Sequence, residues 1–246
     1  MNSSIVSIGL SNPGAPIPQA EIARFMQLAH QLDGQKRRKL DFLYRKSGID
    51  FRHSVLEDFQ KEEVAEFTFF PKNKELSPFP STSARMNVFE AEAAGLAEQA
   101  VQNALQQAQI EAFSLTHLVL VSCTGMVAPG VELELMRRLG IPSSVQRYGI
   151  HFMGCYAAFT GLRLADQLVK ANPESRVLVV SVELCTLHFQ KEYNEDNLLA
   201  NSLFGDGAAA ALVMQSEKGL QIKNYLSEVL WEGEKDMAWK IGDFGF

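Results

Sequence analysis

A cysteine that could act as a nucleophile stands where a short apolar segment runs into a helical pattern. Cys155 follows Gly154, and no charged residue occurs from Tyr156 to Leu162. The first turn of a helix offers unpaired backbone N–H groups and the positive end of the helix dipole, and both stabilise a thiolate. The uncharged run predicts that the opening turns of this helix are buried. Cys155 is therefore a candidate nucleophile, and an inert cysteine packed in the core is the alternative, since free cysteines are often buried.

The cysteines as a set argue against other kinds of site. They stand at positions 123, 155 and 185, an odd number with wide spacing and no C-x-x-C pair. This spacing predicts neither a disulfide framework nor a zinc knuckle, and it fits a protein of the reducing cytoplasm. A metal site built from the three cysteines is less favoured than a catalytic thiol, because no histidine or aspartate stands at ligand spacing. We therefore expect no metal.

The elements that must position Cys155 follow from the hydropathy pattern. The segments 117–122 and 177–182 are apolar without polar alternation, which is typical of strands covered on both faces. Helical patterns at 131–139 and 156–170 alternate with them, so we expect a layered α/β fold with helices on both sides of a sheet. Ligands of such sheets gather at the carboxyl ends of the strands. Each cysteine directly follows a predicted strand end, which places all three at one rim.

The rest of the chain completes this pattern. A glycine on each side of Asp206 predicts a tight turn or a close backbone approach. The other predicted elements are a strand at 5–10, helices at 21–32 and 36–45, a loop at 71–83 that ends in Ser81-Thr82-Ser83 as the N-cap of a long helix, and strands at 145–152, 208–214, 220–230 and from 239 onward.

Composition narrows the function classes. The chain has 246 residues, of which 46% are hydrophobic, and its formal net charge of −6 argues against a nucleic-acid binder. No apolar run approaches the roughly 18 residues of a membrane span, and the first residues do not read as a secretory signal. The basic run from Lys36 to Lys39 is either a solvated helix face or a patch for a phosphorylated carrier such as coenzyme A.

Several blocks of sequence resemble a known family. In order they are Ser122-Cys123-Thr124-Gly125-Met126 with Ala128-Pro129-Gly130, Phe152-Met153-Gly154-Cys155-Tyr156-Ala157-Ala158, Gly161-Leu162-Arg163-Leu164-Ala165, Val182-Glu183-Leu184-Cys185, and Leu203-Phe204-Gly205-Asp206-Gly207-Ala208-Ala209-Ala210. The chain resembles the bacterial type III polyketide synthases, relatives of chalcone synthase within the thiolase superfamily. Segments 45–49 and 81–86 resemble the N-terminal part of that family.

The resemblance implies a layered thiolase-like αβαβα fold, represented here by the N-terminal half, 1–218, and the start of a C-terminal domain, 219–246. It implies an acyltransferase that loads an acyl group from acyl-CoA on Cys155 and extends it by decarboxylative condensation with malonyl-CoA. Coenzyme A thioesters are then substrates, and no cofactor is needed. The substrate pocket would include Thr124, His188, Phe204 and Phe246. Lys46 would bind coenzyme A, with Arg52 as a second candidate.

The sequence departs from the family at its end. The histidine and asparagine that activate the thiol in the family belong to later motifs, and neither motif occurs here, so the chain reads as truncated before them. The resemblance also implies a homodimer in the full-length form and favours alkylpyrone or alkylresorcinol products. Two alternatives stay open: a condensing enzyme like ketoacyl-carrier-protein synthase III, and a non-catalytic thiolase-fold partner subunit.

Overall fold

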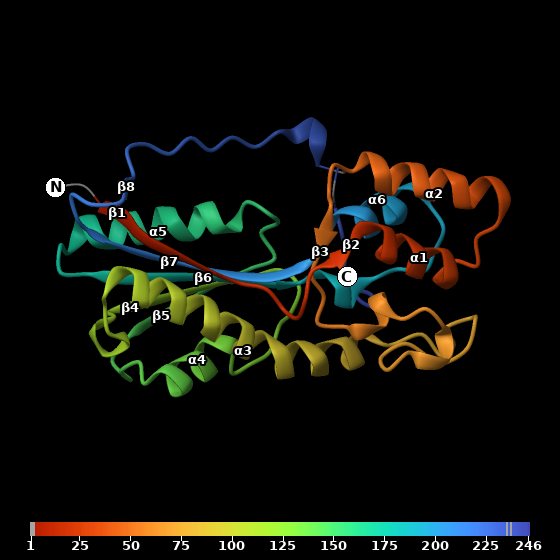
Figure 1. Cartoon of the computed structure of the whole chain (residues 1–246). Coiled ribbons are helices and arrows are strands. Elements are labelled where there is room, and N and C mark those ends of the chain that lie inside the picture. The colour runs from red at the N-terminus through yellow and green to blue at the C-terminus, as the bar shows by residue number, and fades with distance from the viewer. Residues whose placement is uncertain (1–2, 235, 237) are drawn as a thin grey trace. The chain divides into compact units, whose positions relative to one another are not determined.

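The computed structural model describes residues 3–234, 236 and 238–246, which form two compact units. The first unit comprises Met1–Ser11, Glu90–Glu183 and Ala208–Lys240. The second unit comprises Asn12–Phe89, Leu184–Gly207 and Ile241–Phe246. Figure 1 labels the elements of both units.

The first unit is built on a mixed sheet with strand order β5-β4-β6-β7-β1-β8. Its strands are β1 (Ser3–Ser11), β4 (His117–Ser122), β5 (Gln146–His151), β6 (Arg176–Leu184), β7 (Asp206–Gln215) and β8 (Leu220–Gln221). Strand β4 lies between β5 and β6 and runs parallel to both, whereas β1 runs antiparallel to β7 and β8. All six residues of β4 are buried, as expected of a strand covered on both faces.

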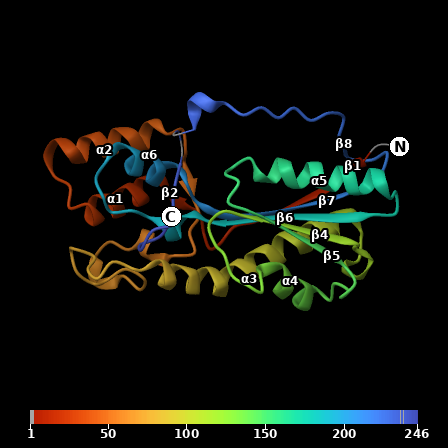
Figure 2. The same ribbon diagram turned by 180° about the vertical axis from the view of Figure 1, so that it is seen from behind.

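Helices cover both faces of this sheet. Helix α5 (Ala157–Ala171) lies on one face, and α4 (Val131–Leu139) and the later part of α3 (Thr82–Ala108) lie on the other (Figure 1, and from behind in Figure 2). Glycines allow the helices to lie close to the sheet on each face. A Cβ on Gly161 of α5 would lie 3.0 Å from Val179, and one on Gly9 of β1 would lie 2.1 Å from a backbone oxygen of α3. The predicted layered α/β architecture is confirmed.

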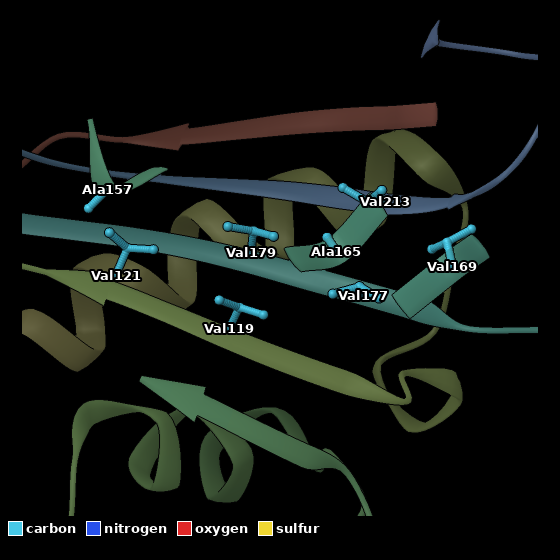
Figure 3. Packing of buried hydrophobic residues seen from close by; sticks show 8 residues of the cluster. All are labelled: Val119, Val121, Ala157, Ala165, Val169, Val177, Val179 and Val213. Atoms are coloured by element: carbon cyan, nitrogen blue, oxygen red, sulfur yellow. The ribbon is translucent and has the colours of Figure 1, made fainter. Parts of the chain in front are cut away.

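Branched side chains fill the space between α5 and the sheet. Figure 3 shows one cluster of them, formed by Val119, Val121, Ala157, Ala165, Val169, Val177, Val179 and Val213. Valines from three adjacent strands alternate toward the small residues of α5, so the helix lies close to the sheet. This packing fixes the start of α5, where Cys155 stands.

The second unit is mostly helical. Its elements are β2 (Ile17–Pro18), α1 (Gln19–Ala29), α2 (Gly34–Lys46), β3 (Phe51–Arg52), η1 (Glu57–Gln60), η2 (Val64–Glu66), the start of α3, η4 (Cys185–His188) and α6 (Glu195–Leu203). Its core is aromatic, and the ring of Phe25 lies 4.4 Å from that of Phe59 and 5.5 Å from that of Phe189. Buried Asp58 ties the loop beside it by accepting hydrogen bonds from the backbone N–H groups of Thr68 and Phe70.

The predicted elements near the C-terminal end are partly wrong. Strand β8 covers only Leu220–Gln221, and after it Leu226 is 96% exposed and Leu230 72% exposed. From residue 239 onward the described chain forms one bridge, between Gly242 and Gly245, instead of a strand. Apolar residues form a strand only where a neighbouring strand supplies hydrogen bonds, and β8 meets β1 only at Ser4 and Ile5.

Helix α6 was absent from the sequence prediction. Its signal is Asn194, whose side chain accepts a hydrogen bond of 2.8 Å from the backbone N–H of Asn197 and so caps the helix. Two acidic residues, Glu195 and Asp196, occupy its first turn, where the helix dipole favours negative charge. The helix ends beside Phe204, one of the predicted pocket residues.

Candidate active site

A sharp turn delivers Cys155 to the head of α5. Strand β5 ends at His151, and the turn that follows has left-handed backbone at Phe152, with φ of +55°, and at Gly154, with φ of +83°. Glycine adopts this conformation at little cost, but for phenylalanine it costs about 1–3 kcal/mol, and such strain clusters at functional sites. The backbone N–H of Ala157 then closes the turn on the carbonyl of Gly154 at 3.1 Å. Cys155 stands two residues before the first residue of α5.

The thiol is open to solvent. Cys155 is exposed, as are its neighbours Tyr156, at 52%, and Phe159, at 67%. The prediction that the opening turns of α5 are buried is wrong, because only the face with Ala157 and Gly161 packs on the sheet. The alternative of a packed cysteine is also wrong. An exposed cysteine at a helix start is accessible to a bulky electrophile.

The ends of three parallel strands form the rim around this turn. In the sheet register Ser122 of β4 lies opposite His151 of β5, and Val121 lies opposite Ser181 of β6, so the carboxyl ends share one edge. The thiol of buried Cys123 donates to the carbonyl of Gly154, with the sulfur 3.8 Å from the oxygen. The predicted common rim is confirmed for Cys123 and Cys155. Cys123 supports the turn.

A carboxylate also belongs to this rim. Glu183, near the end of β6, accepts a hydrogen bond of 2.8 Å from the backbone N–H of Cys123 and one of 2.5 Å from the hydroxyl of Thr124. Burial raises the pKa of Glu183, and these hydrogen bonds oppose that rise. Thr124 is thus held by a partly buried acid.

Sequence reasoning did not select Glu183 as a site residue. The available signal was a single acidic residue near the end of a strand that is otherwise largely apolar. Burying a carboxylate is costly, so an acid at such a position indicates a specific set of donors around it.

One histidine lies at the same edge. Nδ1 of His151 is 3.3 Å from the carbonyl oxygen of Ser122. A carbonyl can only accept, so Nδ1 is the donor in this contact. His151 is thereby tied to the end of β4.

The other predicted pocket residues belong to the second unit. The rings of His188 and Phe246 stack with centroids 4.1 Å apart, and the backbone N–H of Phe246 donates to Nδ1 of His188 at 3.1 Å. Half-buried Phe204 follows α6 directly as its C-cap residue. The structure therefore brings His188 and Phe246 together, while Thr124 and Cys155 lie at the rim of the first unit.

The two candidates for coenzyme A binding differ in exposure. Lys46 is the last residue of α2 and is exposed, so its ammonium group is available to a phosphate. Arg52 is only 7% exposed, and its guanidinium donates to Gln19 and to the carbonyl of Phe204. Arg52 is wrong as a surface anchor, because its donors are directed into the second unit.

Two features are absent from the described part of the chain, which omits 1, 2, 235 and 237. In that part of the chain, no group of three or more His, Cys, Asp or Glu residues is arranged to hold a metal ion. No helix there combines the length and apolar character needed to cross a bilayer.

Comparison with known proteins identifies relatives over nearly the whole length of this chain. Residues 2–217 match the family described as chalcone and stilbene synthases, N-terminal domain. The probable polyketide synthase 1 of Dictyostelium discoideum is 29% identical over 98% of this chain, which spans 8% of that protein. The alpha-pyrone synthesis polyketide synthase-like Pks18 of Mycobacterium tuberculosis is 33% identical over 76% of this chain. The matched region is 45% of the length of Pks18.

Two solved structures share the architecture. The C-terminal type III polyketide synthase domain of Steely1, a type I/III hybrid from Dictyostelium, superposes with a TM-score of 0.86 at 28% identity. That match covers all of this chain and 66% of the Steely1 domain. PKS-I from the brown alga Ectocarpus siliculosus gives a TM-score of 0.79 at 29% identity, over 87% of this chain and 56% of that one. The chain therefore belongs to the chalcone and stilbene synthase family, whose N-terminal domain occupies residues 2–217.

Proposed function

We propose that this chain supplies the nucleophile of a type III polyketide synthase. The thiolate of Cys155 attacks the carbonyl of an acyl-CoA, the carbon–sulfur bond to coenzyme A breaks, and coenzyme A leaves as its thiolate. The acyl group then stays on Cys155 as a new thioester. The observation that carries the proposal is the exposed residue Cys155 at the head of α5, in a chain of this family.

The extension step follows from the same intermediate. Malonyl-CoA loses carbon dioxide, and the resulting carbanion attacks the acyl carbonyl, which lengthens the chain and releases the Cys155 thiolate. The backbone N–H of Cys155 is a candidate donor to the oxyanion that forms at each attack, since helix starts present such groups. Pks18 carries alpha-pyrone synthesis in its name, and this supports alkylpyrones as products, with alkylresorcinols as the second class.

Further parts of the proposal rest on the resemblance. Thr124, His188, Phe204 and Phe246 line the substrate pocket, and Lys46 binds a phosphate of coenzyme A. The resemblance implies that a histidine and an asparagine activate the thiol, and their motifs do not occur in 1–246, so the chain alone is expected to have less than full activity. A homodimer, a cytoplasmic location and a domain boundary at residue 218 belong to the same proposal.

Intact-protein mass spectrometry tests the loading step. The purified chain is incubated with palmitoyl-CoA, and we expect a mass increase of one palmitoyl group that disappears in Cys155→Ala. Cys185→Ala is the matched control and should keep the adduct, because the resemblance assigns the nucleophile to position 155. Persistence of the adduct in Cys155→Ala would refute the proposal, and so would absence of an adduct both in this chain and in a version extended by the relatives' C-terminal region.

The same assay distinguishes the two alternatives. Loading from an acyl group on a carrier protein, without loading from palmitoyl-CoA, would favour the ketoacyl-carrier-protein synthase III class. No loading from either donor, also in a version extended by the relatives' C-terminal region, would favour a non-catalytic partner subunit.

A further inference from the structure

Three side chains donate hydrogen bonds to carbonyl groups at the C-terminal end of α6. The last carbonyls of a helix have no partner within it and carry the negative end of its dipole. Here Asn201 accepts a hydrogen bond of 2.7 Å from the hydroxyl of Tyr44, and Ser202 accepts one of 2.8 Å from the amide of Gln19. The carbonyl of Phe204, just after the helix, accepts from Nη1 of Arg52.

Arg52 organises this cap. It is buried, its Nε donates to the Gln19 oxygen at 2.9 Å, and its guanidinium carbon lies 5.8 Å from the centre of the Tyr44 ring. A buried cation needs partners, and the end of a helix supplies negative potential. Arg52 therefore links the two other capping side chains to Phe204.

Hydrogen bonds also hold the backbone of the residues that follow Phe204. The backbone N–H of Asp206 donates to the carbonyl of His53 at 2.9 Å, and a Cβ on Gly205 would lie 3.4 Å from that carbonyl oxygen. The Asp206 carboxylate accepts from the backbone N–H groups of Val55 and Thr186, both at 2.8 Å. The Phe204 backbone is thus held on both sides, while its side chain is only half-buried.

We propose that Arg52, Gln19 and Tyr44 are positioning residues that fix Phe204 and thereby set which acyl chains the synthase accepts. The inference rests on the proposed function, in which Phe204 lines the substrate pocket. A side chain can limit chain length only if the backbone that carries it stays in place. The cap at the C-terminal end of α6 supplies this restraint on the Phe204 backbone, although none of its three members needs to touch substrate.

A competition assay tests the inference. The protein is offered hexanoyl-CoA and palmitoyl-CoA together, and the ratio of the two adducts on Cys155 is measured by mass spectrometry. We expect Arg52→Met to shift this ratio by about tenfold, the lower end of the roughly 10- to 200-fold by which an apolar pocket distinguishes substrates that differ by one methylene. Tyr44→Phe, which removes one hydroxyl and keeps the ring, should shift it in the same direction by less. Arg52→Lys should restore part of the wild-type ratio, because it returns a cation to the helix end.

Controls separate positioning from general weakening. Phe67→Leu, in the aromatic core of the same unit, lowers stability without touching the α6 cap and should keep the wild-type ratio. Phe204→Leu should shift the ratio as Arg52→Met does. If Phe204→Leu shifts the ratio and both Arg52→Met and Tyr44→Phe leave it unchanged, the inference is overturned.

A second measurement does not require activity. Amide hydrogen exchange over 203–207 should become faster in Arg52→Met and Tyr44→Phe, with exchange over 64–70 unchanged. Wild-type exchange over 203–207 in both variants would overturn the inference even if no acyl adduct formed. If neither wild type nor its version extended by the relatives' C-terminal region forms an adduct while exchange responds as expected, the proposed function fails, and the cap is a structural restraint only, so the selectivity inference fails with it.

Discussion

The buried carboxyl of Asp206 makes the stability of the protein depend on pH in a direction opposite to that of most surface acids. Burial raises the pKa of Asp206 from 3.8 to about 6, although hydrogen bonds from Thr186 and Val55 and the charge of Arg52 oppose the rise. The unfolded chain ionises this group near 3.8. An acid whose folded pKa is raised contributes stability below the unfolded pKa, and this contribution is lost as the pH rises through the folded pKa.

The size of the effect follows from the two pKa values. A difference of about two pKa units corresponds to about 3 kcal/mol, at roughly 1.4 kcal/mol per unit. Linkage places about 2 kcal/mol of this between about pH 4.5 and pH 7. We therefore expect the Asp206 contribution to the free energy of unfolding to fall by about 2 kcal/mol over that interval.

Urea denaturation of wild type and Asp206→Asn, followed by circular dichroism, isolates this contribution. The amide does not titrate, so any fixed cost of the substitution is the same at each pH, and only the carboxyl changes the difference between the two proteins. Glu195→Gln is the contrasting control. A hydrogen bond to Lys39 lowers the pKa of exposed Glu195, so its small contribution should be lost as the pH falls. A difference between wild type and Asp206→Asn that stays constant or grows with pH would refute the reasoning.

Three further predictions concern packing and the site. Gly9→Ala should lower the free energy of unfolding by more than about 3 kcal/mol, because its Cβ would lie 2.1 Å from a backbone oxygen of α3. Gly95→Ala should raise it by up to about 1 kcal/mol, because no atom lies nearer than 3.9 Å to the added Cβ. Urea denaturation measures both, and equal effects would contradict the packing argument. Peptide mapping after brief iodoacetamide treatment should find exposed Cys155 alkylated well before buried Cys123, and equal rates would contradict the exposure argument. Lys46→Ala should raise the acyl-CoA concentration for half-maximal loading about threefold and leave loading from acyl-N-acetylcysteamine, which lacks phosphates, unchanged; an equal effect on both donors would exclude a phosphate contact.

Local sequence was sufficient for much of the first unit. The apolar runs at 117–122 and 177–182 became β4 and β6, and the helical pattern at 156–170 became α5. These elements combine strong periodicity or continuous burial with clear ends, so nearby residues alone identify them. The run at 220–230 has similar composition but formed only β8, because a strand depends on a partner that its own residues do not specify.

The local sequence also did not predict which residues at the start of α5 are exposed. The first turns of α5 carry no charge, yet Phe159 is 67% exposed. Hydropathy predicts which residues can be buried, whereas the neighbouring elements determine which of them are covered. The sequence correctly predicts that Cys155 lies at a rim of the sheet, but only the structure shows that the residue is exposed to solvent.

The sequence by itself determined the alternating strands and helices from β4 to β6, the cysteine at the head of α5 and the family blocks. The tertiary structure decided which groups face one another. The hydroxyl of Thr124 reaches the carboxylate of Glu183 across 59 residues, and Arg52 reaches the carbonyl of Phe204 across 152. Helix and strand patterns arise from neighbours in the chain, but a hydrogen bond between distant residues exists only after the sheet register and the helix packing have brought them together.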